Sequence, residues 1–216
     1  MLIKNLKTHN IKAIVYVLCS LLSFYFFLKI SGKEYSRFHE LWSFMFFSWS
    51  LAIISEIKFQ EFMRETIIIQ GVQQNINLIM KLVTVQIQFL SMCVFFFKDS
   101  VFLLLALMSI FILFHYVKTL NEENNEISSL RYIKNLNLFL IIGFLCIFLK
   151  FSFTGAIFII LGMAINYFSI NLYNSKVKIF NQVGHRELYN MMQLISLIMF
   201  YRGGAELPAQ GPKLIY

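Results

Sequence analysis

Long apolar runs separated by charged residues account for most of this 216-residue chain. Each run approaches the roughly 20 residues that cross a hydrocarbon core of about 30 Å, and flanking Lys and Arg side chains can extend the shorter ones by snorkelling. The pattern therefore predicts an all-α, polytopic membrane protein with about six transmembrane helices. The six runs cover residues 13–28, 41–55, 82–97, 100–117, 135–149 and 151–175.

The distribution of Lys and Arg between the runs predicts the orientation of these spans. With six spans, 14 of the 19 basic residues lie on the side that holds both chain ends, and five lie on the other. Cytoplasmic loops carry an excess of Lys and Arg. We therefore expect both termini in the cytoplasm.

Two polar-faced segments interrupt or follow the spans. Over residues 58–81, apolar residues recur at steps of three and four while Glu and Gln residues occupy the opposite face, which predicts an amphipathic helix at the cytoplasmic interface, divided at Gly71. Residues 176–202 predict a second interfacial helical segment after a transmembrane domain of residues 1–175. Residues 203–216 hold both prolines and three of the nine glycines, which predicts a flexible tail, or a non-native one.

Composition sharpens the class of protein. Hydrophobic residues make up 58% of the chain and charged residues 14%, whereas soluble proteins average about 45–50% and 25%. These values exclude an ordinary soluble enzyme and a disordered chain. The net charge of +8 is explained by the orientation bias, because no basic run is interleaved with exposed aromatics as nucleic-acid binding requires. The three cysteines lie inside apolar runs and are interpreted as buried small hydrophobes.

Ionisable and metal-binding groups are sparse in the predicted spans. No carboxylate falls inside the six runs, which argues against a proton-coupled transporter, an ion pump and an aspartyl intramembrane protease. His39 beside Glu40 cannot supply the three or four ligands of a zinc site. His39 and His115 are therefore interpreted as interfacial aromatics, and no metal or cofactor is predicted.

Uncharged polar residues inside the predicted spans can have two roles. They bond across helices as packing contacts, or they line a substrate path. The residues proposed for a polar path are Gln86, Gln88, Asn166 and Asn171.

The charged stretch after the second run carries a family resemblance. It reads Glu56-Ile-Lys-Phe-Gln-Glu-Phe-Met-Arg-Glu-Thr and continues to Lys81. In this stretch and in the order of elements, the chain resembles type-2 ABC exporter permeases, including the small haem-exporter-like permeases. It departs from them in having Arg64-Glu65-Thr66 where Glu-x-Gly-Thr is common, and no proline before Pro208. The resemblance implies a cytoplasmic helix that couples to a separate ATPase through Glu56, Glu61, Arg64, Glu65 and Lys81.

The predicted function follows from these observations. We expect the permease subunit of an ABC-type exporter in a bacterial inner (cell) membrane or an organellar membrane, with the lipid bilayer and a cytoplasmic ATPase or other membrane subunits as partners. A homo-oligomer stays open, and no nucleic acid is expected. The alternatives are a structural or assembly subunit of a larger membrane complex, and a lipid-modifying enzyme with His39 or His185 as its base.

Overall fold

The computed structural model describes residues 2–32, 36–56, 67–118, 125–175 and 185–208. Within these ranges the fold is entirely helical, which confirms the predicted all-α class. The helices are α1 (Leu2–Ser31), α2 (Arg37–Glu56), α3 (Ile67–Phe96), α4 (Asp99–Lys118), α5 (Asn125–Phe151), α6 (Thr154–Ser175) and α7 (His185–Glu206).

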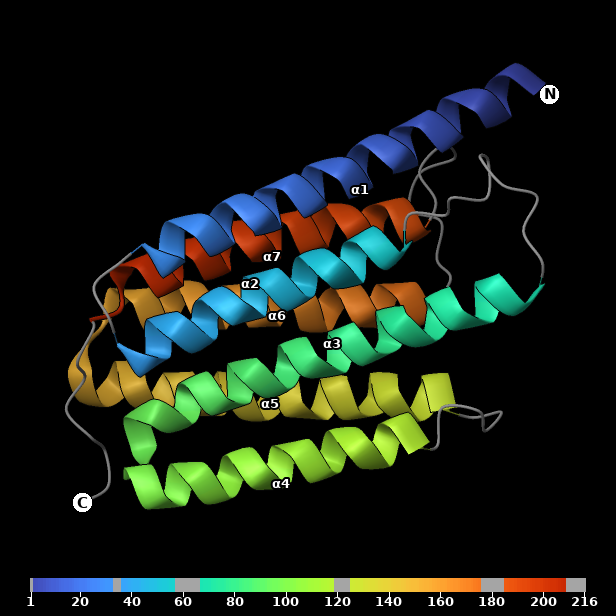
Figure 1. Cartoon of the computed structure of the whole chain (residues 1–216). Helices are drawn as coiled ribbons and strands as arrows, with labels where there is room; N and C mark the ends of the chain where they lie inside the picture. The colour runs from blue at the N-terminus through green and yellow to red at the C-terminus, as the bar shows by residue number, and fades with distance from the viewer. Residues whose placement is uncertain (1, 33–35, 57–66, 119–124, 176–184, 209–216) are drawn as a thin grey trace.

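The helices form an antiparallel bundle in two layers (Figure 1). Helices α1 to α4 follow one another across one layer, and α5, α6 and α7 return behind it. The layers meet where α1 packs on α7 and where α3 packs on α5. This order leaves α2 between α1 and α3 in one layer and α6 between α5 and α7 in the other.

Within the described residues, five helices are long and apolar enough to cross a membrane: α1, α3, α4, α5 and α6. Their outward faces carry large exposed hydrophobic side chains, and Phe111 on α4 is 73% exposed. Apolar surface on this scale is expected where lipid, and not water, surrounds the protein. The chain is therefore a multi-pass membrane protein by the length and composition of its helices.

The second predicted span, residues 41–55, forms most of α2 but is not among these five helices. Its serines and tryptophans lower its hydropathy, and the fold gives them partners. The hydroxyls of Ser48 and Thr84 lie 2.9 Å apart, and the indole of Trp42 bonds to the backbone of α7. Because α2 lies between other helices, much of its surface faces protein.

The C-terminal segment differs most from the sequence prediction. We expected an interfacial helix over 176–202 and a flexible tail from Gly203. Instead, α7 continues through Gly203 and Gly204 to Glu206, and Phe200 is completely buried in the bundle. The tail prediction is therefore wrong for residues 203–206, which form the end of α7, because Gly203 allows α7 to pack closely on α6. Residues 176–184 and 209–216 lie outside the described residues.

Because of the seventh helix, the described chain finishes at the opposite end of the bundle from its start. Thr154, at the start of α6, donates a hydrogen bond of 3.2 Å to Glu206, at the end of α7. The start of α1 lies at the other end of the bundle (Figure 1). The expectation of both termini on one side assumed six antiparallel helices. With seven, the two ends of the described chain lie at opposite ends.

Helix α3 corrects the predicted boundary between an interfacial helix and a span. It runs as one 30-residue helix from Ile67 to Phe96. The expected break at Gly71 is absent from this helix, and Lys81 lies within it. Residues 58–66 of the predicted interfacial helix lie outside the described residues.

Candidate functional site

A line of polar residues runs along the buried face of α3. Asn77, Lys81, Thr84, Gln88 and Ser91 follow one another at steps of four and three, which places them on one face of the helix. Thr84, Gln88 and Ser91 are buried, and the other two are partly buried. At 1.5 Å per residue the line extends over about 21 Å. We call these five residues the α3 polar stripe.

The stripe faces α2 along part of its length. The Asn77 side chain donates a 2.7 Å hydrogen bond to the carbonyl of Ala52, and Thr84 meets Ser48, about one turn closer to the start of α2. Ser91 donates a 2.7 Å bond to the carbonyl of Ile87 in its own helix. Asn77 and Thr84 thus place an amide and a hydroxyl group on the contact between α2 and α3.

A small recess opens beside the stripe at Lys81. Its volume of about 20 Å³ is room for a water molecule, too small for a larger solute. The Lys81 ammonium lies 5.7 Å from the centre of the Tyr189 ring, within range of a cation–π interaction. Four helices supply the lining: Tyr16, Cys19, Trp49, Ala52, Ile53, Lys81, Tyr189 and Gln193.

Gln193 links this recess to a polar seam between α6 and α7. Its amide nitrogen donates hydrogen bonds to Asn166 Oδ1 at 2.6 Å and to Ser169 Oγ at 2.8 Å. One turn further along α7, Ser196 donates to the carbonyl of Gly162 at 2.7 Å. These bonds hold the two helices together in a region where lipid offers no competing partners.

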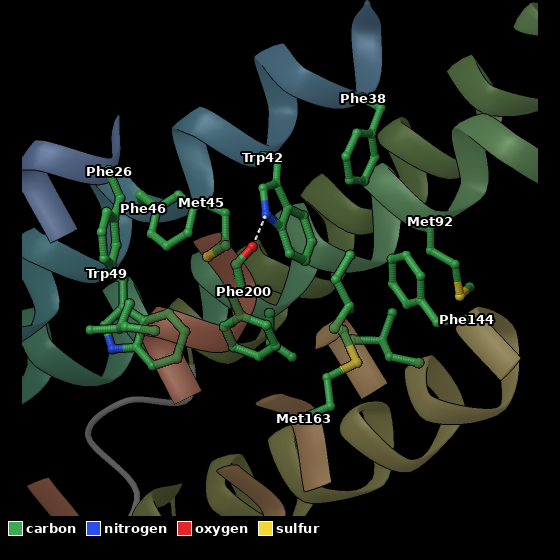
Figure 2. Packing of buried hydrophobic residues seen from close by; sticks show 14 of the residues in the cluster. Phe26, Phe38, Trp42, Met45, Phe46, Trp49, Met92, Phe144, Met163 and Phe200 are labelled. Atoms are coloured by element: carbon green, nitrogen blue, oxygen red, sulfur yellow. Dashed lines mark hydrogen bonds between the residues drawn. The ribbon is translucent and has the colours of Figure 1, made fainter. Parts of the chain in front are cut away.

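Aromatic side chains close the other end of the stripe. Ser91 lies one turn before Phe95, whose ring is centred 5.2 Å from that of Phe38. Phe38 stacks on Trp42, which also contacts Phe144 and Phe200. Figure 2 shows Trp42 between these rings, and its indole N–H bonded to the carbonyl of Phe200. All five rings are buried, so the polar line ends against a packed apolar cluster, which we call the aromatic plug.

The residues predicted to couple to a partner are only partly placed. Glu61, Arg64 and Glu65 lie outside the described residues. Glu56 is the last residue of α2. Lys81 lines the recess between α1, α2, α3 and α7, so its described surroundings are other helices of the same bundle.

The residues predicted to line a polar path do not share one surface. Gln86 donates to the Tyr132 hydroxyl on α5, Asn166 belongs to the α6–α7 seam, and Asn171 is partly buried further along α6. Only Gln88 belongs to the stripe. The prediction missed Asn77, Thr84 and Ser91, although their spacing from Lys81 and Gln88 was visible in the sequence.

The histidines and cysteines differ in part from their predicted positions. His39 is buried in the first turn of α2, where its Nδ1 lies 2.7 Å from Ser36 Oγ. Its backbone N–H donates to the same oxygen at 3.3 Å, so Ser36 caps the start of α2. His115 is exposed.

Cys19 and Cys93 are buried as predicted, whereas Cys146 is exposed on α5. Among the described residues no three His, Cys, Asp or Glu side chains form a group that could hold a metal ion.

Comparison of the chain with protein-family models, curated proteins and solved structures finds no match. The described core offers hydrogen-bonding groups in a line, one basic residue beside a recess, and an apolar closure. This is an arrangement that can receive a polar group into the bundle.

Proposed function

We propose that this chain is the membrane-embedded subunit of a transport complex, in which the α3 polar stripe receives the substrate. The stripe itself is the observation that supports this function. Polar groups are costly inside a membrane and are therefore rare unless they have a role. A line of five, extending about 21 Å from Asn77 to Ser91, is longer than isolated packing contacts require.

With the aromatic plug in place, the structure would represent a closed state of the proposed path. The stripe begins in the half of α3 nearest the start of α1 and stops one turn before Phe95. A substrate path along it would be closed at that end by Phe38, Phe95 and Trp42. Transport would then require α2 and α3 to separate locally, since Phe38 and Trp42 belong to α2 and Phe95 to α3. It would also require α7 to move, because Phe200 of α7 packs on Trp42.

The energy for that movement is proposed to come from a partner. The six carboxylates in the described ranges all lie within four residues of a helix end: Glu40, Glu56, Asp99, Glu126, Glu187 and Glu206. Carboxylates deep in a span are the usual groups of proton and ion coupling. An ATPase that docks at the cytoplasmic end, as the resemblance to ABC exporter permeases implies, would supply the energy through the segment that contains Glu61 and Glu65.

Basic residues support an orientation with the start of α1 in the cytoplasm. Of the 13 Lys and Arg residues in the described ranges, eight lie in the half of the bundle at which α1 begins and five in the other half. The excess follows the positive-inside rule. The end of α7 would then face the opposite side of the membrane.

Affinity purification from native membranes tests the partner. We expect an ATPase to co-purify with the wild-type chain and to be lost from the Glu61→Lys/Glu65→Lys variant. The matched control is Glu122→Lys/Glu123→Lys, which makes the same charge change in the segment between α4 and α5 and should retain the ATPase. Purification of the wild-type chain as a stable monomer without an ATPase would contradict the proposal.

One observation favours a second candidate, a structural subunit of a larger membrane complex. Helix α4 packs mainly against α3, and its outer face exposes Leu103, Phe111 and Phe114. Such a face suits another transmembrane helix as well as lipid. Photo-crosslinkers at Phe111 and at Phe168 on α6 would separate these cases, because a subunit contact predicts a discrete protein adduct at Phe111 only, and lipid contact predicts lipid adducts at both.

A further inference from the structure

We propose that Gln88 and Asn137 form a binding subsite in the core of the bundle for a small group that both donates and accepts hydrogen bonds: a water molecule, or the hydroxyl of a small neutral solute. This inference deepens the proposed function, on which it rests, by naming the class of group that the stripe receives near its closed end.

The first observation is the burial of two amides without protein partners. Asn137 on α5 is 0% exposed, and Gln88 on α3 is 1% exposed. Neither the nitrogen nor the oxygen of the Asn137 amide has a hydrogen-bond partner among the described residues, and the Gln88 nitrogen likewise has none. A buried amide without a partner is strongly unfavourable in an apolar surrounding. Both amides therefore need a hydrogen-bonding ligand that the described protein groups do not supply.

The second observation is that the two amides lie at the same level of the bundle. Helices α3 and α5 run in the same direction (Figure 1) and pack on each other. Gln86 bonds to Tyr132, and further along, the rings of Phe89 and Phe139 are centred 6.0 Å apart. Gln88 lies between Gln86 and Phe89, and Asn137 lies between Tyr132 and Phe139. The register therefore places both amides in one layer.

The unpaired atoms define the chemistry of the ligand. The nitrogens of Gln88 and Asn137 are donors, and Asn137 Oδ1 is an acceptor. A ligand for all three must therefore accept and donate at once, as water and hydroxyl groups do. Buried waters typically bond to about three otherwise unsatisfied polar groups. A metal cation would leave the two donors unpaired, and no described carboxylate lies near this level of the bundle to neutralise it.

Met92 supplies a reporter for the subsite. It lies one turn after Gln88 on α3 and contacts Gly143 of α5, and it is buried. Hydroxyl radicals generated by a short X-ray pulse oxidise methionine sulfur close to a bound water, and the sulfoxide is detected by mass spectrometry. The full chain in nanodiscs is used, and the exposed Met191 normalises the dose.

The experiment compares the wild type with Gln88→Leu/Asn137→Leu. We expect Met92 oxidation in the wild type despite its burial, and a several-fold loss in the double variant. The matched control is Gln86→Leu, an amide-to-leucine change on the same helix outside the subsite, which should keep Met92 oxidation. Unoxidised Met92 in the wild type, or equal oxidation in the double variant, would overturn the subsite.

A second arm uses only the wild type and identifies the ligand even where a variant fails to fold. Glycerol and sucrose are added in turn at matched osmolality and matched radical dose. A fall in Met92 oxidation with glycerol alone assigns the subsite to solute hydroxyls, while equal oxidation in both assigns it to water. Neither arm needs the ATPase, so loss of the proposed partner with Met92 oxidation intact would refute the transport complex and leave the subsite standing.

Discussion

The indole N–H of Trp42 on α2 donates a 3.0 Å hydrogen bond to the backbone carbonyl of Phe200 on α7, across 158 residues of sequence. The Trp42 ring also meets the Phe200 ring edge-on, with centroids 5.8 Å apart. This pair joins the two helices whose hydropathy alone does not mark them as spans. It explains how a helix rich in serine and tryptophan and a helix with two glycines in its last turn belong to one apolar bundle.

Replacing Trp42 by Phe should destabilise the bundle moderately. The change keeps an aromatic ring and removes the donor, so we expect a loss of about 1 kcal/mol in the free energy of unfolding, the typical worth of one such bond. Trp42→Ala should cost more, about 3–5 kcal/mol, because it also leaves a cavity.

Unfolding in mixed detergent micelles, followed by circular dichroism, measures both variants. The matched control is Trp49→Phe, since Trp49 also packs on Phe200, with ring centroids 5.5 Å apart. A larger loss for Trp49→Phe than for Trp42→Phe would show that the indole bond is not what distinguishes Trp42.

Glycines at the α6–α7 contact should not tolerate a methyl group. A Cβ on Gly155 would lie 2.6 Å from the carbonyl oxygen of Gly203, and one on Gly203 would lie 2.7 Å from that of Gly155. The obstructing atoms are backbone, so the helices themselves must move apart. We expect Gly155→Ala and Gly203→Ala each to lose about 1–3 kcal/mol, the range typical of overpacking.

Thermal unfolding in detergent compares these variants with Gly32→Ala. A Cβ on Gly32 meets its nearest atom at 3.6 Å, an ordinary contact, so this variant should keep the stability of the wild type. If Gly203→Ala were as stable as Gly32→Ala, the close packing of α7 against α6 would be wrong.

The Gln193–Asn166 bond should show coupling in a double-mutant cycle. Gln193→Leu removes the donor to Asn166 and Ser169 and leaves two acceptors unpaired, so we expect a loss of about 1–2 kcal/mol. Asn166→Leu alone should cost less, because Gln193 keeps its bond to Ser169.

The double variant should lose less than the sum of the two single variants, since removing both partners leaves fewer buried groups unsatisfied. Strict additivity in reversible unfolding would mean that the two side chains do not interact in the membrane.

Reporter tags at the two chain ends should lie on opposite sides of the membrane. The described chain runs through seven helices, and the start of α1 and the end of α7 lie at opposite ends of the bundle (Figure 1). We expect a tag before α1 to be protected in the cytoplasm and a tag after residue 208 to be accessible from outside intact cells.

A tag inserted between Lys118 and Asn125 serves as the control, because α4 ends and α5 begins in the same half of the bundle as α1 begins. It should behave like the N-terminal tag. Two terminal tags on the same side would favour six spans with α7 outside the membrane.

Hydrophobic patterning determined the helical membrane class, because any backbone in hydrocarbon must satisfy its own hydrogen bonds, and long apolar helices do so. It also located the approximate limits of α4 and α6, whose outward faces are apolar. For α5 it located the end but not the start, because that helix begins at Asn125, ten residues before the predicted run. Charge placement in the sequence also showed that carboxylates avoid the predicted spans.

Only the tertiary structure decided whether the more polar helices, α2 and α7, pack inside the bundle. Hydropathy measures what a helix would gain in lipid, whereas α7 gains its stability from Trp42, Gly155 and the other groups that it packs against. The composition after Gly203 predicts a flexible tail. In the fold, however, the missing side chain of Gly203 lets α7 approach α6. In the same way, Gln88 could be recognised as an intramembrane polar residue, but its pairing in one layer with Asn137 depends on the register between α3 and α5, which no local pattern encodes.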